Sequence, residues 1–282
     1  MKKLLLATLL LSANFAHALE IKTYSADENS FSVQSTLVLG EKEAVLIDAG
    51  FTRADALRIA GNILDSQKEL TTILVSNADP DYYFGVATLK EIFPNAKVVT
   101  TPAVLEKINA KVEGKVNYWS PKMGNNAPKA VVLPEKLDSN TLTLDGQNIE
   151  IRGTTGILAH RPYVWIPSLK TITGNVSVFG NMHLWTADAQ TKAERQAWIA
   201  QLDEMASLKP KVVIAGHATP NTKMTVDLLK ANKAYLKKYE QVLASSQNSG
   251  QVVAKMKVAY PKYQAVGNLE LGAKVNKGEM KW

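Results

Sequence analysis

Strand-like and helix-like segments alternate along the first half of this chain, and that order restricts the fold more than any other feature. Short runs of aliphatic and β-branched residues are each followed by a polar turn and then by an amphipathic stretch. The strand-like runs lie at 36–39, 44–47, 73–75 and 98–99. Helix-like stretches begin at Thr52 and at Pro102, and another contains Leu89. The first two runs predict a hairpin, and Thr52 with Asp55 forms a capping box. The alternation predicts an α/β fold.

The second half repeats this plan with more strands. Residues 113–139 are rich in Gly, Asn, Pro and Lys and predict a long surface excursion. The strands that follow lie close together, at 142–144, 149–151, 163–166 and 171–173, and predict a meander. A second capping box at Thr191 opens a helix, and a strand at 212–214 leads into His217. We expect residues 19–282 to form one domain with a helical C-terminal extension from about residue 223.

The first 18 residues have the organisation of a secretion signal. Lys2 and Lys3 precede an apolar run at 4–11, and residues 16–18 form a small-x-small cleavage sequence. A short membrane anchor is the alternative, but the apolar run is too short to cross a bilayer. The sequence therefore predicts cleavage before Leu19 and a periplasmic or secreted protein with no membrane anchor.

Composition excludes several other classes of protein. Hydrophobic residues make up 46% of the chain and charged residues 21%, which is typical of globular proteins and not of disordered or coiled-coil ones. The absence of cysteine excludes disulfides and cysteine-bound metals. The net charge of +7 is spread along the chain, so it does not indicate a nucleic-acid partner.

Three polar loops follow predicted strands, at 76–85, 173–175 and 215–218. Sites in α/β folds lie at the carboxyl ends of strands, so all three loops are at the appropriate edge. Asp79 and Asp81 can direct two carboxylates at one point, and without a cation between them one pKa should be raised. The alternative is an Asp-Pro-Asp turn that only caps the next helix.

The order of these segments resembles that of the metallo-β-lactamase superfamily from about residue 31 to residue 217. The matching segments are 45–50, 81–85, 164–167, 172–175 and 215–217. The resemblance implies a four-layer αββα sandwich with a metal site between its two sheets at one edge. It also implies a hydrolase, although this fold hosts many chemistries.

The resemblance carries over only part of the superfamily's metal site. The four positions of the His-x-His-x-Asp-His motif fall on Asn77, Asp79, Asp81 and Tyr82. A later His of the family falls on Ile157, a bridging Asp on Asn175 and a final His on His217. Only Asp81 and His217 keep the family's residue. The metal ligands that remain are Asn77, Asp79, Asp81, Asn175 and His217, with Tyr82 a poor one. We expect at most one divalent ion, zinc or a harder ion such as manganese or calcium, and the set is also compatible with no metal.

Several aromatic and histidine residues are candidates for a pocket. His160 becomes a ligand if the loop 153–159 is shifted, and otherwise lies at the surface or at a strand start. His183 either lines the pocket or packs beside Trp185. Tyr82, Tyr83 and Trp185 are core residues by their type, or form part of a pocket wall.

Two functions are compatible with these residues. The first is an exported hydrolase in which Asp81 and His217 are catalytic, a single metal ion activates water, and the substrate is an ester, lactone, amide or phosphoester. The second is a metal-free pseudoenzyme that serves as a periplasmic small-molecule binding module. Both functions require a small molecule as the partner.

Overall fold

A computed structural model describes residues 18–282 of the chain. The predicted secretion signal at residues 1–18 lies, except for its last residue, outside this described part. Within residues 18–282, no helix is both long enough and apolar enough to cross a membrane.

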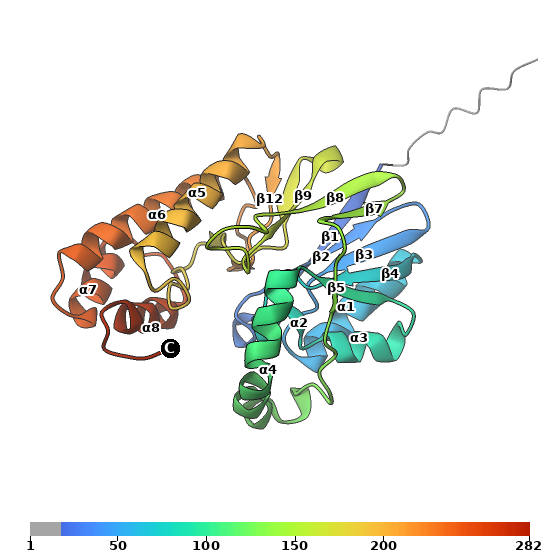
Figure 1. The fold of residues 1–282 in the computed structure, drawn as a ribbon, viewed down its shortest axis with the longest axis horizontal. Coiled ribbons are helices and arrows are strands. Elements are labelled where there is room, and N and C mark those ends of the chain that lie inside the picture. Colours follow the sequence, from blue (N-terminus) through green and yellow to red (C-terminus); the bar gives the residue numbers. More distant parts are fainter. Residues whose placement is uncertain (1–17) are drawn as a thin grey trace, which may run out of the picture.

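A six-stranded sheet carries the first half of the chain, in the order β1-β2-β3-β4-β5-β6 (Figure 1). Its strands are β1 (Glu20–Ser25), β2 (Gln34–Leu39), β3 (Glu43–Ile47), β4 (Glu69–Leu74), β5 (Lys97–Thr100) and β6 (Glu135–Lys136). The strands β1 to β3 pair antiparallel, whereas β3 to β6 pair parallel. The predicted hairpin is confirmed, because Thr36 pairs with Ile47 across it.

The second half of the chain forms a five-stranded sheet in the order β12-β10-β9-β8-β7. Its strands are β7 (Thr141–Leu144), β8 (Gln147–Arg152), β9 (Tyr163–Ile166), β10 (Thr171–Thr173) and β12 (Val212–Val213). The antiparallel pairing of β7 to β10 confirms the predicted meander. Beside this sheet, β11 (Phe179–Gly180) pairs with β13 (His217–Ala218), and this pairing fixes the position of His217.

Alternating side chains on the strands fill separate cores. Val45 and Val164 belong to the core between the two sheets. Their chain neighbours Leu46 and Trp165 pack on the opposite faces of their sheets, against the helices. Because successive residues of a strand point to opposite faces, a strand buried on both sides must be apolar throughout. This requirement explains the continuous apolar runs in the sequence.

Helices cover both outer faces, and Figure 1 shows α1 and α3 on one side and α5 and α6 on the other. The first group is α1 (Arg53–Ser66), α2 (Pro80–Tyr83), α3 (Val86–Ile92) and α4 (Pro102–Met123). The second group is α5 (Lys192–Ser207), α6 (Asp227–Ala244), α7 (Ser249–Ala259) and α8 (Val266–Asn276). Short 3₁₀ turns are η1 (Glu28–Ser30), η2 (Gly124–Asn126) and η3 (Pro167–Leu169). The predicted α/β fold of the four-layer αββα type is confirmed.

The helix α4 corrects one sequence prediction. Residues 113–139 were expected to form a surface excursion, but α4 continues to Met123 through Gly114 and Pro121. A stripe of apolar residues, including Val112, Val116 and Trp119, packs on the core beneath the helix. This packing outweighs the unfavourable helix propensities of glycine and proline. The correction matters because the extra turns carry Lys115 towards the polar loop after β4.

Capping residues fix the starts of two helices that flank the sheets. The predicted capping boxes at Thr52 with Asp55 and at Thr191 with Glu194 are both present.

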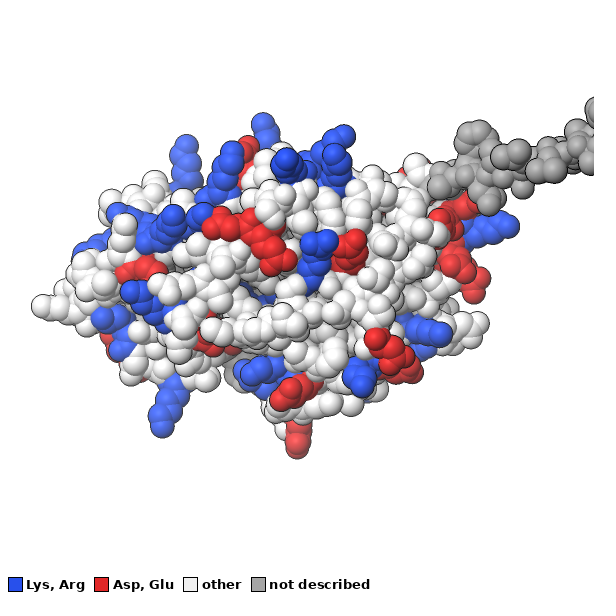
Figure 2. All heavy atoms as spheres, turned by 45° about the horizontal axis from the view of Figure 1, so that its top comes forward, with Lys and Arg blue, Asp and Glu red and all other residues white. Residues whose placement is uncertain are grey.

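On the face shown in Figure 2, lysine and arginine side chains are scattered among acidic ones. The positive charge on this face is therefore spread over several elements.

Candidate functional site

A buried carboxylate anchors the polar loop that follows β4. Asp48, just after β3, accepts hydrogen bonds from the backbone N–H and the hydroxyl of Ser76, each 2.7 Å long. Asp48 has a φ of 66°, a left-handed conformation that short polar residues tolerate. Burial raises the pKa of Asp48 to about 7, although the bonds from Ser76 oppose this shift. The pair fixes where the polar segment 76–85 begins.

Asp81, Tyr82 and His217 meet at the edge between the two sheets. Oδ2 of Asp81 lies 3.6 Å from Nε2 of His217. The hydroxyl of Tyr82 lies 3.0 Å from the same nitrogen and 3.1 Å from the carbonyl oxygen of Asn175. Two loops about 135 residues apart in the sequence are thus brought together, as the strand order predicts.

Both ring nitrogens of His217 already have hydrogen-bond partners. Nδ1 lies 2.9 Å from the carbonyl oxygen of Phe31, which can only accept, so Nδ1 carries the proton. Burial lowers the pKa of His217. Nε2 lies 3.0 Å from the Tyr82 hydroxyl, which donates its proton to the carbonyl oxygen of Asn175. The ring nitrogen that a metal ion would need is therefore in contact with the Tyr82 hydroxyl.

Asn175 acts as a structural link. Its Nδ2 donates to the carbonyl oxygen of Ile214 at 3.0 Å, and its Oδ1 accepts from the backbone N–H of Val178 at 2.9 Å. Both ends of the amide are thus used to hold the loops after β10 and β12 together. Asn77 is similarly engaged, because its Oδ1 accepts from the backbone N–H of Asp79 at 3.0 Å.

Asp79 forms an ion pair with a lysine of α4. Nζ of Lys115 lies 2.5 Å from Oδ1 of Asp79 and donates to the carbonyl oxygen of Ala78 at 3.1 Å. Burial opposes ionisation of Asp79, but the charge and hydrogen bond of Lys115, together with the charges of Arg161 and His217, lower the pKa of the carboxyl. For Asp81, burial and then the Asp79 carboxylate raise the pKa well above its ordinary value. Burial is the main cause of this rise, and the repulsion between the two carboxylates, on which the expectation rested, comes second.

The donor set does not fit a metal ion. Within residues 18–282, no group of three or more histidine and carboxylate side chains is arranged so that it could hold one. The ligand positions are occupied by other bonds: His217 by Tyr82 and Phe31, Asn175 by backbone groups, and Asp79 by Lys115. A catalytic zinc site needs about three protein donors converging on one point, and calcium takes about six to eight oxygens.

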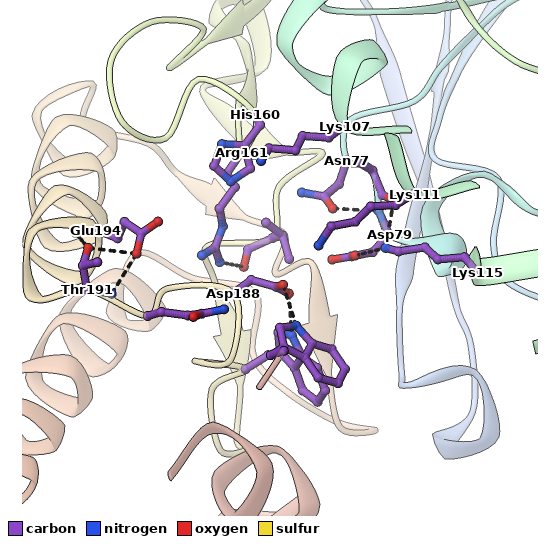
Figure 3. Close-up of a pocket in the computed structure, with 15 residues that line it drawn as sticks. Asn77, Asp79, Lys107, Lys111, Lys115, His160, Arg161, Asp188, Thr191 and Glu194 are labelled. Atoms are coloured by element: carbon purple, nitrogen blue, oxygen red, sulfur yellow. Dashed lines mark hydrogen bonds and ion pairs between the residues drawn. The ribbon is translucent and has the colours of Figure 1, made fainter. Parts of the chain in front are cut away.

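A cavity of about 290 Å³ opens beside this edge. Figure 3 shows Lys107, Lys111 and Lys115 entering it from α4, with Thr191 and Glu194 on the opposite side. The polar loop after β4, the segment that carries His160 and Arg161, and the two indole rings of Trp185 and Trp282 complete the wall. The cavity therefore lies between elements of both halves of the chain.

The structure places two of the five pocket candidates at this cavity. His160 and Trp185 line it, whereas Tyr82, Tyr83 and His183 do not. Tyr83 is buried against Phe84. His183 is buried 2.9 Å from the hydroxyl of Tyr235, in an aromatic cluster that helices α6 and α7 cover. His183 is therefore a packed core residue beside Tyr235 and does not line this cavity.

Sequence reasoning missed the basic residues of the cavity. Lys107, Lys111 and Lys115 are spaced by four, which places them on one face of a helix. This spacing favours a helix that continues past residue 113, whereas the composition of residues 113–139 predicts a loop. Arg161 follows His160 in the sequence and belongs to no periodic pattern that would indicate a binding site.

Comparison with known proteins identifies the fold family. The sequence matches the family model described as the metallo-β-lactamase superfamily over residues 29–217. A metallo-β-lactamase family protein from Thermus thermophilus is similar in structure, with a TM-score of 0.63 and 15% identity over 92% of this chain and 91% of that one. No curated protein matches the sequence.

Two further solved structures are similar. A metallo-β-lactamase from Pontibacter korlensis has a TM-score of 0.54 and 17% identity over 78% of this chain and 95% of that one. A stereoselective inverting sec-alkylsulfatase from Pseudomonas sp. has a TM-score of 0.57 and 16% identity over 86% of this chain and 47% of the sulfatase. At these identities the likeness establishes the fold alone.

Proposed function

The chain belongs to the metallo-β-lactamase superfamily, and from this premise we propose that it binds a small molecule without using a metal ion. The superfamily is hydrolase-like, and its chemistry depends on metal-bound water. The observation that carries the proposal is the ion pair between Lys115 and Asp79. It places an ammonium group on a carboxylate that stands at a metal-ligand position of the family.

An ammonium group at this place disfavours a metal ion for an electrostatic reason. A divalent cation near Asp79 would have to displace Lys115 or lie beside a like charge. The lysine also donates to the carbonyl oxygen of Ala78, so its position is held by two acceptors. The chain thus supplies the neutralising charge itself.

The cavity beside this ion pair is the place that we propose for the ligand. Its volume of about 290 Å³ is at the lower end of the range for small-molecule sites. Charged groups and two indole rings line it, which suits a ligand with a polar and an apolar part.

A hydrolase is the second candidate, because Asp81 and His217 lie within 3.6 Å of each other. These are the two positions at which the family's ligand is kept. For this function a metal ion would have to displace the Tyr82 hydroxyl from His217 and Lys115 from Asp79. The present hydrogen bonds therefore favour binding over hydrolysis.

We also propose that the protein acts outside the cytoplasm, in the periplasm or as a secreted protein. The support is the basic start, the apolar run at 4–11 and the small-x-small sequence at 16–18. The mass of the exported chain should correspond to a start at Leu19.

Thermal denaturation tests the binding function. We expect that a panel of small carboxylates, phosphates, amines and neutral compounds contains molecules that raise the melting temperature equally with and without EDTA. A ligand at about 100 times its Kd stabilises the folded state by about 2.7 kcal/mol. Gln190→Trp, at an exposed lining position, should weaken the effect by filling the cavity, whereas Gln247→Trp, at an exposed position elsewhere, should not.

Two outcomes would contradict the binding function. One is stabilisation that appears only after zinc or manganese is added. The other is metal-dependent hydrolysis of ester or phosphoester probes by the wild-type protein.

A further inference from the structure

We propose that the cavity selects an anion, namely a small molecule that carries a carboxylate, phosphate or sulfate next to a flat apolar part. The inference rests on the proposed binding function and adds the ligand class. Arg161, Lys107 and Lys111 receive the acidic group, and Trp185 and Trp282 contact the apolar part.

The acidic residues of the cavity are already occupied. Asp79 pairs with Lys115. Asp188 accepts hydrogen bonds from the indole N–H groups of Trp185, at 2.6 Å, and Trp282, at 2.8 Å. Glu194 accepts from the backbone N–H and hydroxyl of Thr191 in the capping box. Each of these carboxylates therefore already accepts at least one hydrogen bond, and Asp79 is the one that is paired with a cation.

The basic residues, in contrast, have free donors. Within residues 18–282, the side chains of Lys107 and Lys111 form no hydrogen bond and no ion pair. Burial, followed by the charges of Arg161 and Lys107, lowers the pKa of His160. Burial is the largest of these causes, and the charges of Asp188 and Glu194 oppose the shift.

Arg161 is the central observation. The residue is only 3% exposed, yet Nη1 has no hydrogen-bond partner among the described residues. Nη2 donates to the carbonyl oxygen of Val176 at 3.2 Å, and the guanidinium lies 4.3 Å from the ring centre of Trp198. A buried guanidinium with unused N–H groups is costly unless an acceptor completes its bonding.

The geometry supports direct recognition of an anion. Figure 3 shows Arg161 on the wall between the Glu194 side and the Asn77 side, with Lys107 and Lys111 entering from α4. A planar guanidinium pairs with two oxygens of a carboxylate, phosphate or sulfate. The rings of Trp185 and Trp282, whose centres lie 5.3 Å apart, offer an aromatic surface beside it.

Calorimetric titration of the chain from Leu19 tests the proposal with phenylacetate, phenyl phosphate and phenyl sulfate. Phenylacetamide is the neutral control of nearly the same shape. We expect at least one anion to bind with a Kd about tenfold lower than that of the amide. Added salt should weaken anion binding, because the lysine charges are exposed and screened. The three anions distinguish the possible acidic groups.

Lysine variants of α4 provide the matched comparison. Lys107→Met and Lys111→Met should each weaken anion binding about threefold, as expected for exposed charges, and leave amide binding unchanged. Lys122→Met removes the same charge from the same helix outside the cavity and should have no effect. Arg161→Met should weaken binding by about tenfold or more. The exposed lysines keep the test valid even if this buried substitution disturbs folding.

Three results would overturn the anion site: equal binding of phenylacetate and phenylacetamide, affinities that Lys107→Met and Lys111→Met leave unchanged, or no binding of any anion. If neutral compounds still stabilise the protein in EDTA, the binding function stands and only the anion proposal fails. Stabilisation that requires added metal is the separate result that contradicts the function itself.

Discussion

Gly216→Ala is expected to lower the free energy of unfolding by about 3 kcal/mol, the upper part of the usual range for overpacking. A Cβ at this position would lie 1.9 Å from the carbonyl oxygen of Asn175 and 2.8 Å from the Tyr82 hydroxyl. The oxygen belongs to the backbone, so it cannot rotate away. The backbone of Gly216 is also held by hydrogen bonds to Gln34 and Val178. Urea denaturation of both proteins measures the difference.

Gly61→Ala is the control for this substitution. Gly61 lies inside α1, and a Cβ there would meet no atom within 4 Å. Alanine should stabilise the helix by about 0.5–1 kcal/mol. If Gly216→Ala instead changes stability by less than about 1 kcal/mol, the close contact between Gly216 and Asn175 is not as described.

Arg195→Met is expected to destabilise the protein by about 3 kcal/mol, because breaking a buried ion pair leaves its partner uncompensated. Arg195 on α5 is paired with Glu240 of α6. Its Nη1 donates to the carbonyl oxygens of Ala189 and Gln190, and to Asn276 at the end of α8. One guanidinium thus joins three helices on the outer face of the second sheet.

Lys230→Met provides the comparison for Arg195→Met. Lys230 pairs with Asp227 on α6, and both side chains are 79% exposed. Exposed pairs of this kind contribute little, so we expect no measurable change. Equal effects of Lys230→Met and Arg195→Met on the urea midpoint would show that Arg195 does not join the helices.

The fold was predictable because its strands are buried on both faces. Continuous apolar runs at 44–47 and 163–166 can only belong to inner layers, and Thr52 and Thr191 mark helix starts by local capping. The extent of α4 was not predictable in this way. Its continuation depends on a core formed by residues distant in the sequence, which outweighs Gly114 and Pro121.

The site was predictable only where it depends on strand order. Asp81 and His217 meet because the ends of their strands meet. The pairing of Asp79 with Lys115 requires α4 to continue past residue 113, where the composition predicts a surface excursion and only the spacing of the lysines indicates a helix. The role of Asn175 could not be predicted either, because a ligating amide and a bridging amide look alike in a sequence. Arg161 gave no signal in the sequence, because the lack of a partner for its Nη1 can be seen only in three dimensions.

The metal content of the exported protein, purified with neither added metal nor chelator, tests the central claim most directly. The ion pair of Asp79 with Lys115 and the bond of His217 with Tyr82 predict far less than one ion of zinc, manganese or calcium per chain. Elemental analysis should give the same value for wild type, Asp81→Ala and His217→Ala. One or more ions per chain in the wild type, lost in either variant, would contradict the claim that these positions have become structural.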